Sequence, residues 1–357
     1  MPLTSPDRPL LALTLGDCAG IGPEVVVRTA SNPKIKQTCR VVAVGHPELL
    51  TRAADLCGID LSVTHVESFE QAREADECSL ACLCPCSDDV ANVPPGQLDA
   101  RAGAAAFECL VSATQAALDG RIDGIVTAPL SKAALHAAGH IYPGHTEILA
   151  ERCGVSAFGM MLYLPPGEIV KPEFGLGVVH TTLHTSIRSV PDLLDRDAIA
   201  DRIRLMNTFL RRVGCESPRV GVCALNPHAG EDGLFGDEES RLIAPAVEAC
   251  RTEQIEASGP IPADALLRRA VGGEFDGVVA MYHDQGHIAL KLIGFERAVN
   301  ITLGLPIVRT SPSHGTAFDI AWQGTASAEG MIEATRMAVQ LCQNRAKPAL
   351  ESPTASE

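Results

Sequence analysis

Histidines follow three separate apolar runs of this chain, each just past the end of its run. His228 and His283 each follow one such run, and a third run, ending at Val179, leads into His180-Thr181-Thr182-Leu183-His184. Short apolar runs are typical of buried strands, and α/β proteins bind ligands at the carboxyl edge of the sheet. One such histidine is more often a structural residue. Three at one edge are candidates for holding a zinc, cobalt or manganese ion, which would polarise a substrate oxygen.

Two carboxylates are candidates for orienting these histidines. Asp284 directly follows His283, and Asp264 ends the segment Gly259-Pro260-Ile261-Pro262-Ala263-Asp264. A histidine that binds a metal usually donates its second ring N–H to a carboxylate or a carbonyl group. We therefore predict that Asp284 and Asp264 fix the orientation of ligating imidazoles.

Three further polar residues follow His283 at intervals of eight and nine residues. They are Lys291, Asn300 and Arg309. A solvated charge pattern is the simpler interpretation, but Asn300 and Arg309 lie in the apolar run 298–309, where a buried polar group needs a partner. A carboxylate or a phosphate is a natural partner for an arginine. The sequence therefore predicts an anion pocket beside the metal site.

The segment Tyr142–Glu147 precedes a helical stretch of the sequence. His145 and Thr146 would lie near the N-terminus of that helix, where free amide groups and the helix dipole favour an anion. An ordinary helix cap, with Thr146 as the capping residue, accounts for the same pattern. The sequence alone leaves both interpretations open.

A glycine-rich turn, Gly16–Glu24, separates the first apolar run from the first predicted helix. A nucleotide-binding fingerprint would occupy this position, but no third glycine follows Gly22 at the offset that G-x-G-x-x-G requires. A dinucleotide site of that kind is therefore not supported. The turn is either a plain connection into the helix or a loop whose backbone amides and Asp17 face a cleft.

Apolar runs alternate with helical stretches along the whole chain. This alternation is typical of an α/β fold with a mainly parallel sheet. A chain of 357 residues also exceeds the size at which a single core usually divides. We therefore expect an α/β protein with two lobes. The predicted strands are 11–15, 41–45, 124–129, 176–179, 220–225 and 277–280, and the clearest predicted helices are 23–28 and 102–118.

The composition excludes several functional classes. A formal net charge of −15 argues against binding to nucleic acid and to anionic membranes. No apolar stretch reaches the roughly 18 residues of a membrane span, and the first residues lack the pattern of a signal peptide. These features predict a cytoplasmic protein. The polar stretch from Gln343 onward, which contains two prolines, is predicted to be disordered.

The chain contains thirteen cysteines, four of which form a cluster in the sequence. A large protein that is not exported is not expected to use them in disulfides. The spacing of Cys78, Cys82, Cys84 and Cys86 is not that of a structural zinc site. Three of them alternate as residues on one face of a strand would. We interpret the cluster as small buried apolar side chains.

Seven segments, in a fixed order between residue 16 and about residue 319, resemble the 4-hydroxythreonine-4-phosphate dehydrogenase (PdxA) family of pyridoxal phosphate biosynthesis. No single segment is decisive, but the ordered set is specific and spans nearly the whole folded chain. The segments are Gly16-Asp17 with Gly20-Ile21-Gly22-Pro23-Glu24, Val126–Lys132, Gly144-His145-Thr146-Glu147, Asn226–Glu231, Tyr282–Gly286, Asn300–Pro306 and His314–Ala317.

The resemblance implies the fold of the isocitrate/isopropylmalate dehydrogenase class. This fold has two α/β/α lobes that flank an active-site cleft, and the family forms a homodimer that builds each site from both subunits. The first lobe is accordingly predicted to comprise residues 1–140 and 305–342. Residues 141–304 would form the second lobe, with the metal site and the dimer contacts, and residues 343–357 the tail.

The resemblance also implies a role for each candidate site residue. The implied metal ligands are His184, His228 and His283. The implied substrate contacts are His145, Thr146, Lys291, Asn300 and Arg309. The residues implied in holding the dinucleotide are His314, Gly315, Thr316 and Asp319. The catalytic and supporting residues are Lys291, Asp284 and Asp264.

The chain departs from the family pattern at one metal ligand. The family commonly has Thr-Thr-His in direct succession, whereas Leu183 is interposed here between Thr182 and His184. We choose His184 because it precedes Arg188 by four residues, as the family histidine precedes its arginine. His180 is the rival ligand.

The implied reaction is the NAD- or NADP-linked oxidation of 4-phosphohydroxy-L-threonine. One divalent ion per site, which is zinc, magnesium, cobalt or manganese, would bind the secondary alcohol and lower its pKa. The product is a β-keto acid that loses carbon dioxide to give 3-amino-2-oxopropyl phosphate. Lys291 and a water near Asp284 are the two candidates for taking the alcohol proton.

Three other functions share these motifs or this fold. Relatives in the superfamily oxidise D-threonate or D-erythronate 4-phosphate in sugar-acid catabolism, and others oxidise cis-dihydrodiol dicarboxylates in aromatic degradation. A non-catalytic protein that binds a metabolite or stores a metal is the alternative from another class. The density of polar groups at one sheet edge argues against it, because such groups are costly to leave unpaired.

Overall fold

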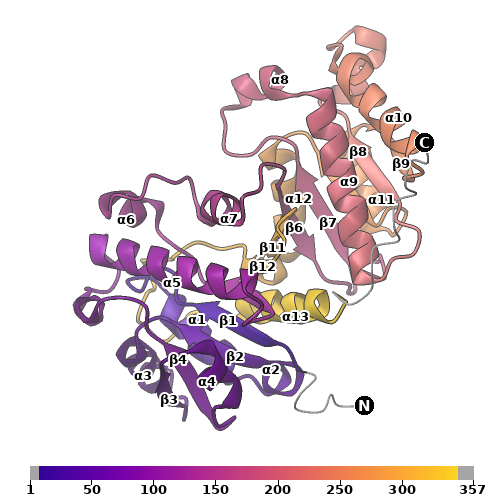
Figure 1. Cartoon of the computed structure of the whole chain (residues 1–357). Helices are drawn as coiled ribbons and strands as arrows, with labels where there is room; N and C mark the ends of the chain where they lie inside the picture. Colours follow the sequence, from indigo (N-terminus) through magenta and orange to yellow (C-terminus); the bar gives the residue numbers. More distant parts are fainter. Residues whose placement is uncertain (1–7, 345–357) are drawn as a thin grey trace, which may run out of the picture.

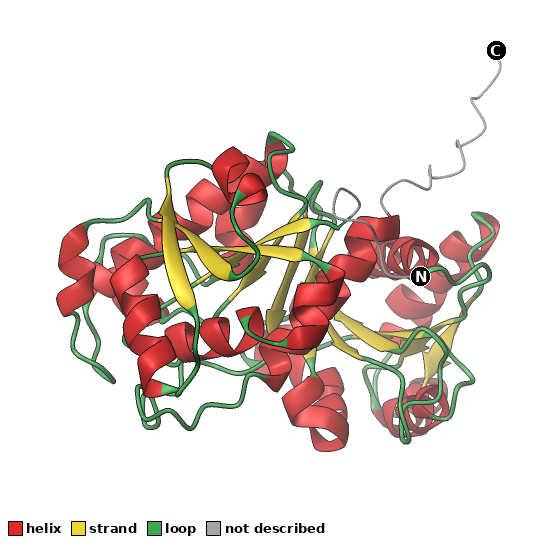
Figure 2. Ribbon diagram, turned by 90° about the horizontal axis from the view of Figure 1, so that it is seen from below, coloured by secondary structure: helices red, strands yellow, loops and turns green. Residues whose placement is uncertain are grey.

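The computed structural model describes residues 8–344, in which twelve strands form one mixed sheet with helices on both faces (Figures 1 and 2). The predicted α/β architecture is confirmed. The strands are β1 (Leu10–Thr14), β2 (Arg40–Val44), β3 (Ser62–Val66), β4 (Ser79–Leu83), β5 (Gly124–Thr127), β6 (Gly159–Leu164), β7 (Leu176–His180), β8 (Val220–Cys223), β9 (Ala257–Ile261), β10 (Gly277–Ala280), β11 (Val299–Leu303) and β12 (Val308–Pro312).

The helices fill the connections between these strands. They are α1 (Gly22–Ala30), α2 (Pro33–Thr38), α3 (Pro47–Leu56), α4 (Phe69–Glu74), α5 (Ala100–Leu118), α6 (Lys132–Ala137), α7 (His145–Cys153), α8 (Val190–Leu193), α9 (Arg196–Val213), α10 (Ala244–Thr252), α11 (Ala263–Val271), α12 (His283–Gly294) and α13 (Glu329–Gln343). One short turn, η4 (Pro227–Gly233), also matters below. In the described part of the chain, no helix is long and apolar enough to cross a membrane.

The strand order is β3-β4-β2-β1-β5-β12-β11-β6-β7-β10-β8-β9. The two outer parts, from β3 to β12 and from β7 to β9, are parallel throughout, and the antiparallel strands β11 and β6 join them. The sheet therefore has two wings with a central seam. Figure 1 shows β11 and β12 at this seam, with one wing below it and the other above.

Alternating side chains in β1 and β2 supply two cores, one on each face of the first wing. Leu11, Leu13 and Ala43 belong to one buried cluster, and Leu10 and Val42 belong to the other. Because both faces are covered by helices, β1 and β2 are apolar except at Thr14 and Arg40, as buried parallel strands usually are. The core on the first of these faces continues into the second wing through Val179 of β7 and Met206 of α9.

The same alternation in β7 decides where its terminal histidine lies. Val179 packs in the cluster that contains α9, whereas Val178 packs in the cluster on the opposite face, with Leu290 of α12. His180 is two residues beyond Val178 and therefore points to the α12 side, where it is fully buried. Gly286 of α12 permits this close packing, since a Cβ there would meet His180 Nε2 at 2.6 Å.

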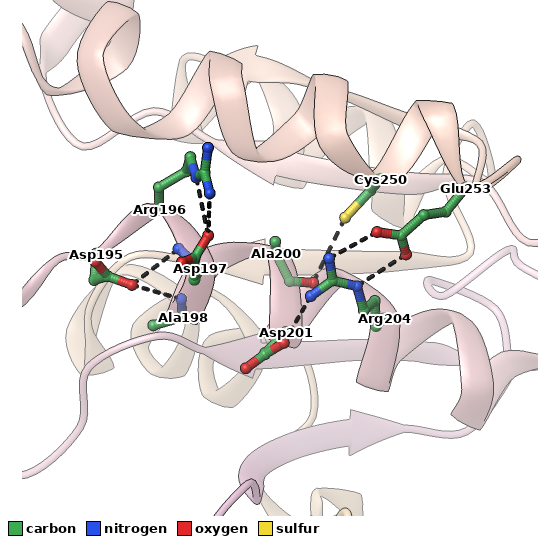
Figure 3. Close-up of polar contacts among 9 residues, drawn as sticks. All are labelled: Asp195, Arg196, Asp197, Ala198, Ala200, Asp201, Arg204, Cys250 and Glu253. Atoms are coloured by element: carbon green, nitrogen blue, oxygen red, sulfur yellow. Dashed lines mark hydrogen bonds and ion pairs between the residues drawn. The ribbon is translucent and has the colours of Figure 1, made fainter.

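Charged side chains cap α9 and join it to α10 on one face of the second wing (Figure 3). The Asp195 carboxylate caps α9 by accepting hydrogen bonds from the backbone N–H groups of Asp197 and Ala198 at 2.9 and 3.0 Å. Arg204 of α9 donates to both carboxylate oxygens of Glu253, the residue that ends α10, at 2.9 and 2.7 Å. These bonds fix α10 beside α9.

The structure differs from two sequence-based expectations. β4 ends at Leu83, so Cys82 alone of the predicted alternating trio lies in a strand, and Cys84 and Cys86 follow it half-buried. Thr146 does not cap its helix, because α7 begins at His145 and Gly144 occupies the cap position.

The boundary between the lobes near residue 141 stays a prediction, and α7 packs on α5 of the first wing. The predicted tail from residue 345 lies outside the described residues.

Glu24 joins α1 to the loop that follows β12. Its carboxylate is fully buried and accepts hydrogen bonds from the backbone N–H groups of Trp322 and Gly324, at 2.7 and 2.8 Å. We expect Glu24→Ala to lower the free energy of unfolding by about 2–4 kcal/mol, because two partly buried donors lose their acceptor. Chemical denaturation would measure this. Glu48→Ala is the control, since Glu48 occupies the first turn of α3 but is exposed. Equal effects of the two substitutions would contradict the assignment.

Candidate active site

His184 and His283 face each other across a pocket of about 480 Å³. His184 lies in the loop after β7 and His283 begins α12, and their ring centroids are 6.0 Å apart. Asp284 also lines the pocket, and His283 Nδ1 lies 2.7 Å from its Oδ1. An imidazole held in this way by a carboxylate has the arrangement that orients a metal ligand.

His180 lies behind this pair and is not in the pocket. Its Nε2 is 3.1 Å from Nδ1 of His287, and the ring of His287 stacks on that of His283 at 3.8 Å. Burial lowers the pKa of His180 to about 3 and that of His287 to about 4, and the neighbouring imidazoles add to both effects. Both rings are therefore neutral at pH 7. His180 and His287 support His283 from the core, whereas His184 meets it from the solvent side.

His228 lies in a turn of unusual backbone conformation. Residues 228–232, four of which are not glycine, all have positive φ values, from 45° to 82°. Such conformations cost free energy and are found where the surrounding structure holds them. The buried Glu239 anchors the residues that lead into this turn, because its Oε1 accepts from the backbone N–H groups of Leu225 and Asn226 at 2.9 and 2.7 Å. His228 itself is exposed, and its ring lies 6.5 Å from that of Phe235.

The three predicted metal ligands do not meet within one chain. His228 does not line the pocket of His184 and His283, and among residues 8–344 no three histidine, cysteine, aspartate or glutamate side chains are placed to share a metal. The two imidazoles suit zinc, cobalt or manganese by their chemistry. A metal ion bound between them would need a third donor. Asp264 does not line this pocket, and it is exposed in the first turn of α11.

Arg309 is a buried cation at the central seam of the sheet. Only 4% of the residue is exposed, and its Nη2 and Nη1 donate to the hydroxyl groups of Thr127 and Thr302 at 2.6 and 3.1 Å. Its Nε is buried without a hydrogen-bond partner. Burial lowers the pKa of Arg309 to about 10, and the negative charge of Glu147 partly offsets this. Hydroxyl groups cannot neutralise a guanidinium, so these two partners leave its positive charge uncompensated.

Two other predicted substrate contacts accompany this arginine. Burial, and then the positive charge of Arg309, holds the pKa of His145 well below its usual range, so His145 is neutral at pH 7. Asn300 lies on β11 next to β12, and its Oδ1 is buried without a partner. Thr146 follows His145 in the first turn of α7.

Glu147 and Lys132 connect the anion site to the histidine pocket, and the sequence prediction did not include either. The negative charge of Glu147 acts on both Arg309 and His184, and the positive charge of Lys132 helps burial to lower the pKa of His184. Both residues belong to the segments that resemble the family. Their membership of these segments, and for Glu147 its place next to Thr146, was the available signal.

Lys291 lies between the histidines and the segment predicted to hold a dinucleotide. Its Nζ donates to the backbone oxygen of Ser313 at 3.4 Å, and its charge lowers the pKa of both His287 and His314. His314 Nε2 is buried without a partner, while its Nδ1 contacts the backbone oxygen of Gly315 at 3.1 Å. An orphaned ring nitrogen of this kind suits a bound polar ligand.

The rest of that segment packs on the glycine-rich turn after β1. The backbone oxygen of Thr316 accepts from the N–H of Ile21 at 3.0 Å, and a Cβ on Gly20 would meet that oxygen at 2.6 Å. Asp319 is exposed, and its backbone oxygen accepts from Gln323 Nε2 at 2.8 Å. The turn and the segment thus form one structural unit beside Lys291.

Comparison with known proteins gives one family. The sequence model described as "Pyridoxal phosphate biosynthetic protein PdxA" matches residues 37–338. This chain belongs to the PdxA family. It is 41% identical to a D-threonate 4-phosphate dehydrogenase of Pectobacterium atrosepticum, over 93% of this chain and 99% of that protein. It is 42% identical to a 4-hydroxythreonine-4-phosphate dehydrogenase of Geobacter metallireducens, over 94% and 96% of the two chains.

Solved structures agree with the family assignment. A 4-hydroxythreonine-4-phosphate dehydrogenase from Klebsiella pneumoniae superposes with a TM-score of 0.82, at 42% identity, over 94% of this chain and all of that one. A terephthalate 1,2-cis-dihydrodiol dehydrogenase from Burkholderia xenovorans LB400 superposes with a TM-score of 0.64, at 30% identity, over 93% and 98% of the two chains. The predicted family and the oxidoreductase class are confirmed.

Asp17 does not face open solvent in this PdxA-family chain. Its carboxylate is fully buried, Oδ1 accepts from the backbone N–H of Ala19 at 2.9 Å, and Oδ2 is buried without a partner. Burial raises the pKa of Asp17 to about 6, the Ala19 hydrogen bond partly opposes this, and the charge of Asp99 adds to it. The folded protein therefore binds this proton more tightly than the unfolded chain does.

The sign of this shift predicts how stability changes with pH. The contribution of Asp17 is most favourable below about pH 4 and falls as the pH rises through 6. Asp17→Asn keeps the acceptor for Ala19 and removes the charge, so we expect it to stabilise the protein by about 1–3 kcal/mol at pH 8 and by much less at pH 4. Denaturation at both pH values would measure this. Asp60→Asn, at an exposed position, should show no such pH dependence.

Proposed function

We propose that this chain oxidises the secondary alcohol of a four-carbon hydroxy acid that carries a 4-phosphate, with NAD or NADP as the hydride acceptor. The buried, unneutralised guanidinium of Arg309 carries this proposal. It requires an anion, and the charge of Glu147 couples it to the histidine pocket. A substrate with a carboxylate and a phosphate would supply anions for both Arg309 and Lys291.

The leading substrate is 4-phosphohydroxy-L-threonine, as in pyridoxal 5'-phosphate biosynthesis. The product would be a β-keto acid that decarboxylates to 3-amino-2-oxopropyl phosphate. D-Threonate 4-phosphate is the second candidate, because relatives named for it are as similar to this chain as those named for the amino compound. D-Erythronate 4-phosphate belongs to the same chemistry. A cis-dihydrodiol dicarboxylate is supported only by a structure that is 30% identical.

The residues divide the work according to their surroundings. Arg309 and Asn300 would bind and orient the anionic substrate, since each has a buried polar atom without a partner, and the neutral His145 lies beside Arg309. His314 to Asp319 would hold the dinucleotide beside Lys291. A bound divalent ion would act as a Lewis acid on the alcohol oxygen. Lys291 and a water near Asp284 are the two candidates for accepting the alcohol proton.

A homodimer with shared sites accounts for the separation of the three histidines. Leu234 and Phe235, in and beside the turn of His228, are exposed by 72% and 49%. Ile288 and Leu292 of α12, which begins at His283, are exposed by 56% and 83%. Exposed apolar groups of this size usually mark an interface. A second copy that covered both surfaces would bring its His228 to the pair formed by His184 and His283.

The reaction is tested by measuring NAD(P)H formation with 4-phosphohydroxy-L-threonine and with D-threonate 4-phosphate, each with and without a chelator. We expect turnover of a phosphorylated substrate that chelation abolishes and added metal restores. Turnover of the amino compound would support the biosynthetic role. Turnover of D-threonate 4-phosphate alone would transfer the protein to sugar-acid catabolism, and turnover that survives chelation would contradict the metal requirement.

The shared site is tested with His228→Ala and His283→Ala. Each variant alone should lose bound metal, measured by elemental analysis, and should lose metal-dependent turnover. Mixed after subunit exchange, they should recover about one quarter of the wild-type activity, because half of the dimers then contain one intact site. His136→Ala is a control, since its ring contacts only the backbone oxygen of Tyr142. Mixtures that stay inactive after proven exchange would place all three ligands in one chain.

A further inference from the structure

Two thiols meet just beyond the carboxyl end of β4, outside the site described above. Cys84 and Cys86 stand on either side of Pro85, and their Sγ atoms are 3.8 Å apart. Both side chains are half-buried. Cys82, the preceding cysteine, differs from them because it is fully buried in β4 and its Sγ donates to the backbone oxygen of Gly45 at 3.3 Å.

The local geometry holds the two sulfur atoms toward each other. The Cys84 thiol also lies 3.5 Å from the backbone oxygen of Cys86, and the ring of Pro85 fixes the backbone torsion between the two residues. A disulfide has an S–S length of about 2.05 Å, so each sulfur has to move by roughly 1 Å to bond. Side-chain rotation in the half-exposed loop is sufficient for a movement of this size.

A third thiol makes Cys84 and Cys86 differ in acidity. A hydrogen bond from Cys109 of α5 lowers the pKa of Cys86, and the Cys84 thiol acts in the same direction, against the effect of burial. Burial, and then the negative charge of Cys86, raises the pKa of Cys84 to about 11. Cys86 is therefore the more acidic thiol of the pair, and Cys84 is the less acidic one. A thiolate is the form of cysteine that reacts with oxidants.

The surroundings favour redox chemistry over metal binding. Within residues 8–344, no three histidine, cysteine, aspartate or glutamate side chains are placed to share a metal ion. Cys109 is only 2% exposed, whereas Cys84 and Cys86 are open to small solutes. We propose that Cys84 and Cys86 form a dithiol that a hydroperoxide converts into a reversible Cys84–Cys86 disulfide.

The oxidation takes place in two balanced steps. The Cys86 thiolate attacks the peroxide, so that an S–O bond forms, the O–O bond breaks, and the leaving oxygen takes up a proton as water or an alcohol. Cys84, as its thiolate, then attacks the sulfur of the Cys86 sulfenic acid. The S–S bond forms, the S–O bond breaks, and the hydroxide leaves as water with the proton that Cys84 gave up. The protein loses two hydrogens, and a dithiol reductant restores them.

Sulfenic acid formation also removes one obstacle to the second step. The negative charge of Cys86 helps to raise the pKa of Cys84, and this charge disappears when the thiolate becomes a neutral sulfenic acid. The pKa of Cys84 should then fall toward its usual range. The resolving thiol thus becomes more reactive only after the first thiol has been oxidised.

Peptide mapping of the reduced full-length protein after native treatment with hydrogen peroxide tests the pair. Trypsin places Cys84 and Cys86 on the peptide 74–101 and Cys109 on the peptide 102–121. We expect the first peptide to lose two hydrogens, with Cys78 and Cys82 still open to alkylation after unfolding, and dithiothreitol to reverse the change. A cross-link between the two peptides, or oxidation confined to other cysteines, would overturn the proposal.

Two variants and an alkylation rate distinguish disulfide formation between Cys84 and Cys86 from non-specific oxidation of cysteines. Cys84→Ser should leave a sulfenic acid on Cys86 that dimedone traps, and Cys86→Ser should abolish the loss of hydrogens. Cys57→Ser is the matched control, because Cys57 is half-buried and burial raises its pKa. In the unmodified protein, which does not depend on any variant folding, iodoacetamide should label Cys86 about tenfold faster than Cys57 at pH 7. Equal rates would overturn the assignment of Cys86 as the more acidic, peroxide-reactive thiol.

Discussion

The buried charge of Arg309 is the constraint on which the site depends. The residue lies on β12, and its hydrogen bonds reach Thr127 on the neighbouring strand β5 and Thr302 on β11. It therefore connects the parallel first wing to the antiparallel seam. Two hydroxyl groups satisfy part of its geometry and none of its charge. The fold accepts this cost at the point where the two wings meet, and a substrate anion would offset it.

The histidine pocket follows from strand alternation and one glycine. His180 ends β7 on the side of α12, and Gly286 lets α12 pack closely enough for His287 to approach it. These two neutral rings fill the space behind His283. His184 lies beyond the strand, where the chain is free to turn toward the pocket. The interposed Leu183 lengthens this loop, but the histidine after it still reaches His283.

The sequence predicted the elements well and the assembly of the site less well. Apolar runs located β1, β5, β7, β8 and β10 because both faces of those strands are buried. The same rule failed for Cys84 and Cys86, because a short run of small apolar residues does not reveal where a strand ends. Lys132 and Glu147 were missed because their charges act across the space between elements. The left-handed turn at His228 depends on Glu239, which is remote in sequence.

The position of His228 links the strained turn to the apolar surfaces. Five consecutive residues with positive φ values are costly, and the buried Glu239 anchors the two residues that lead into them. A turn that served only to connect β8 to α10 would not require this. Within its own chain the turn presents His228 and Leu234 to solvent, which stabilises nothing. The strained turn and the exposed side chains would both be explained if a second copy buried Leu234 and used the His228 imidazole as a metal ligand. The same contact would cover Leu292, so one association would complete the metal site and remove the exposed apolar surface.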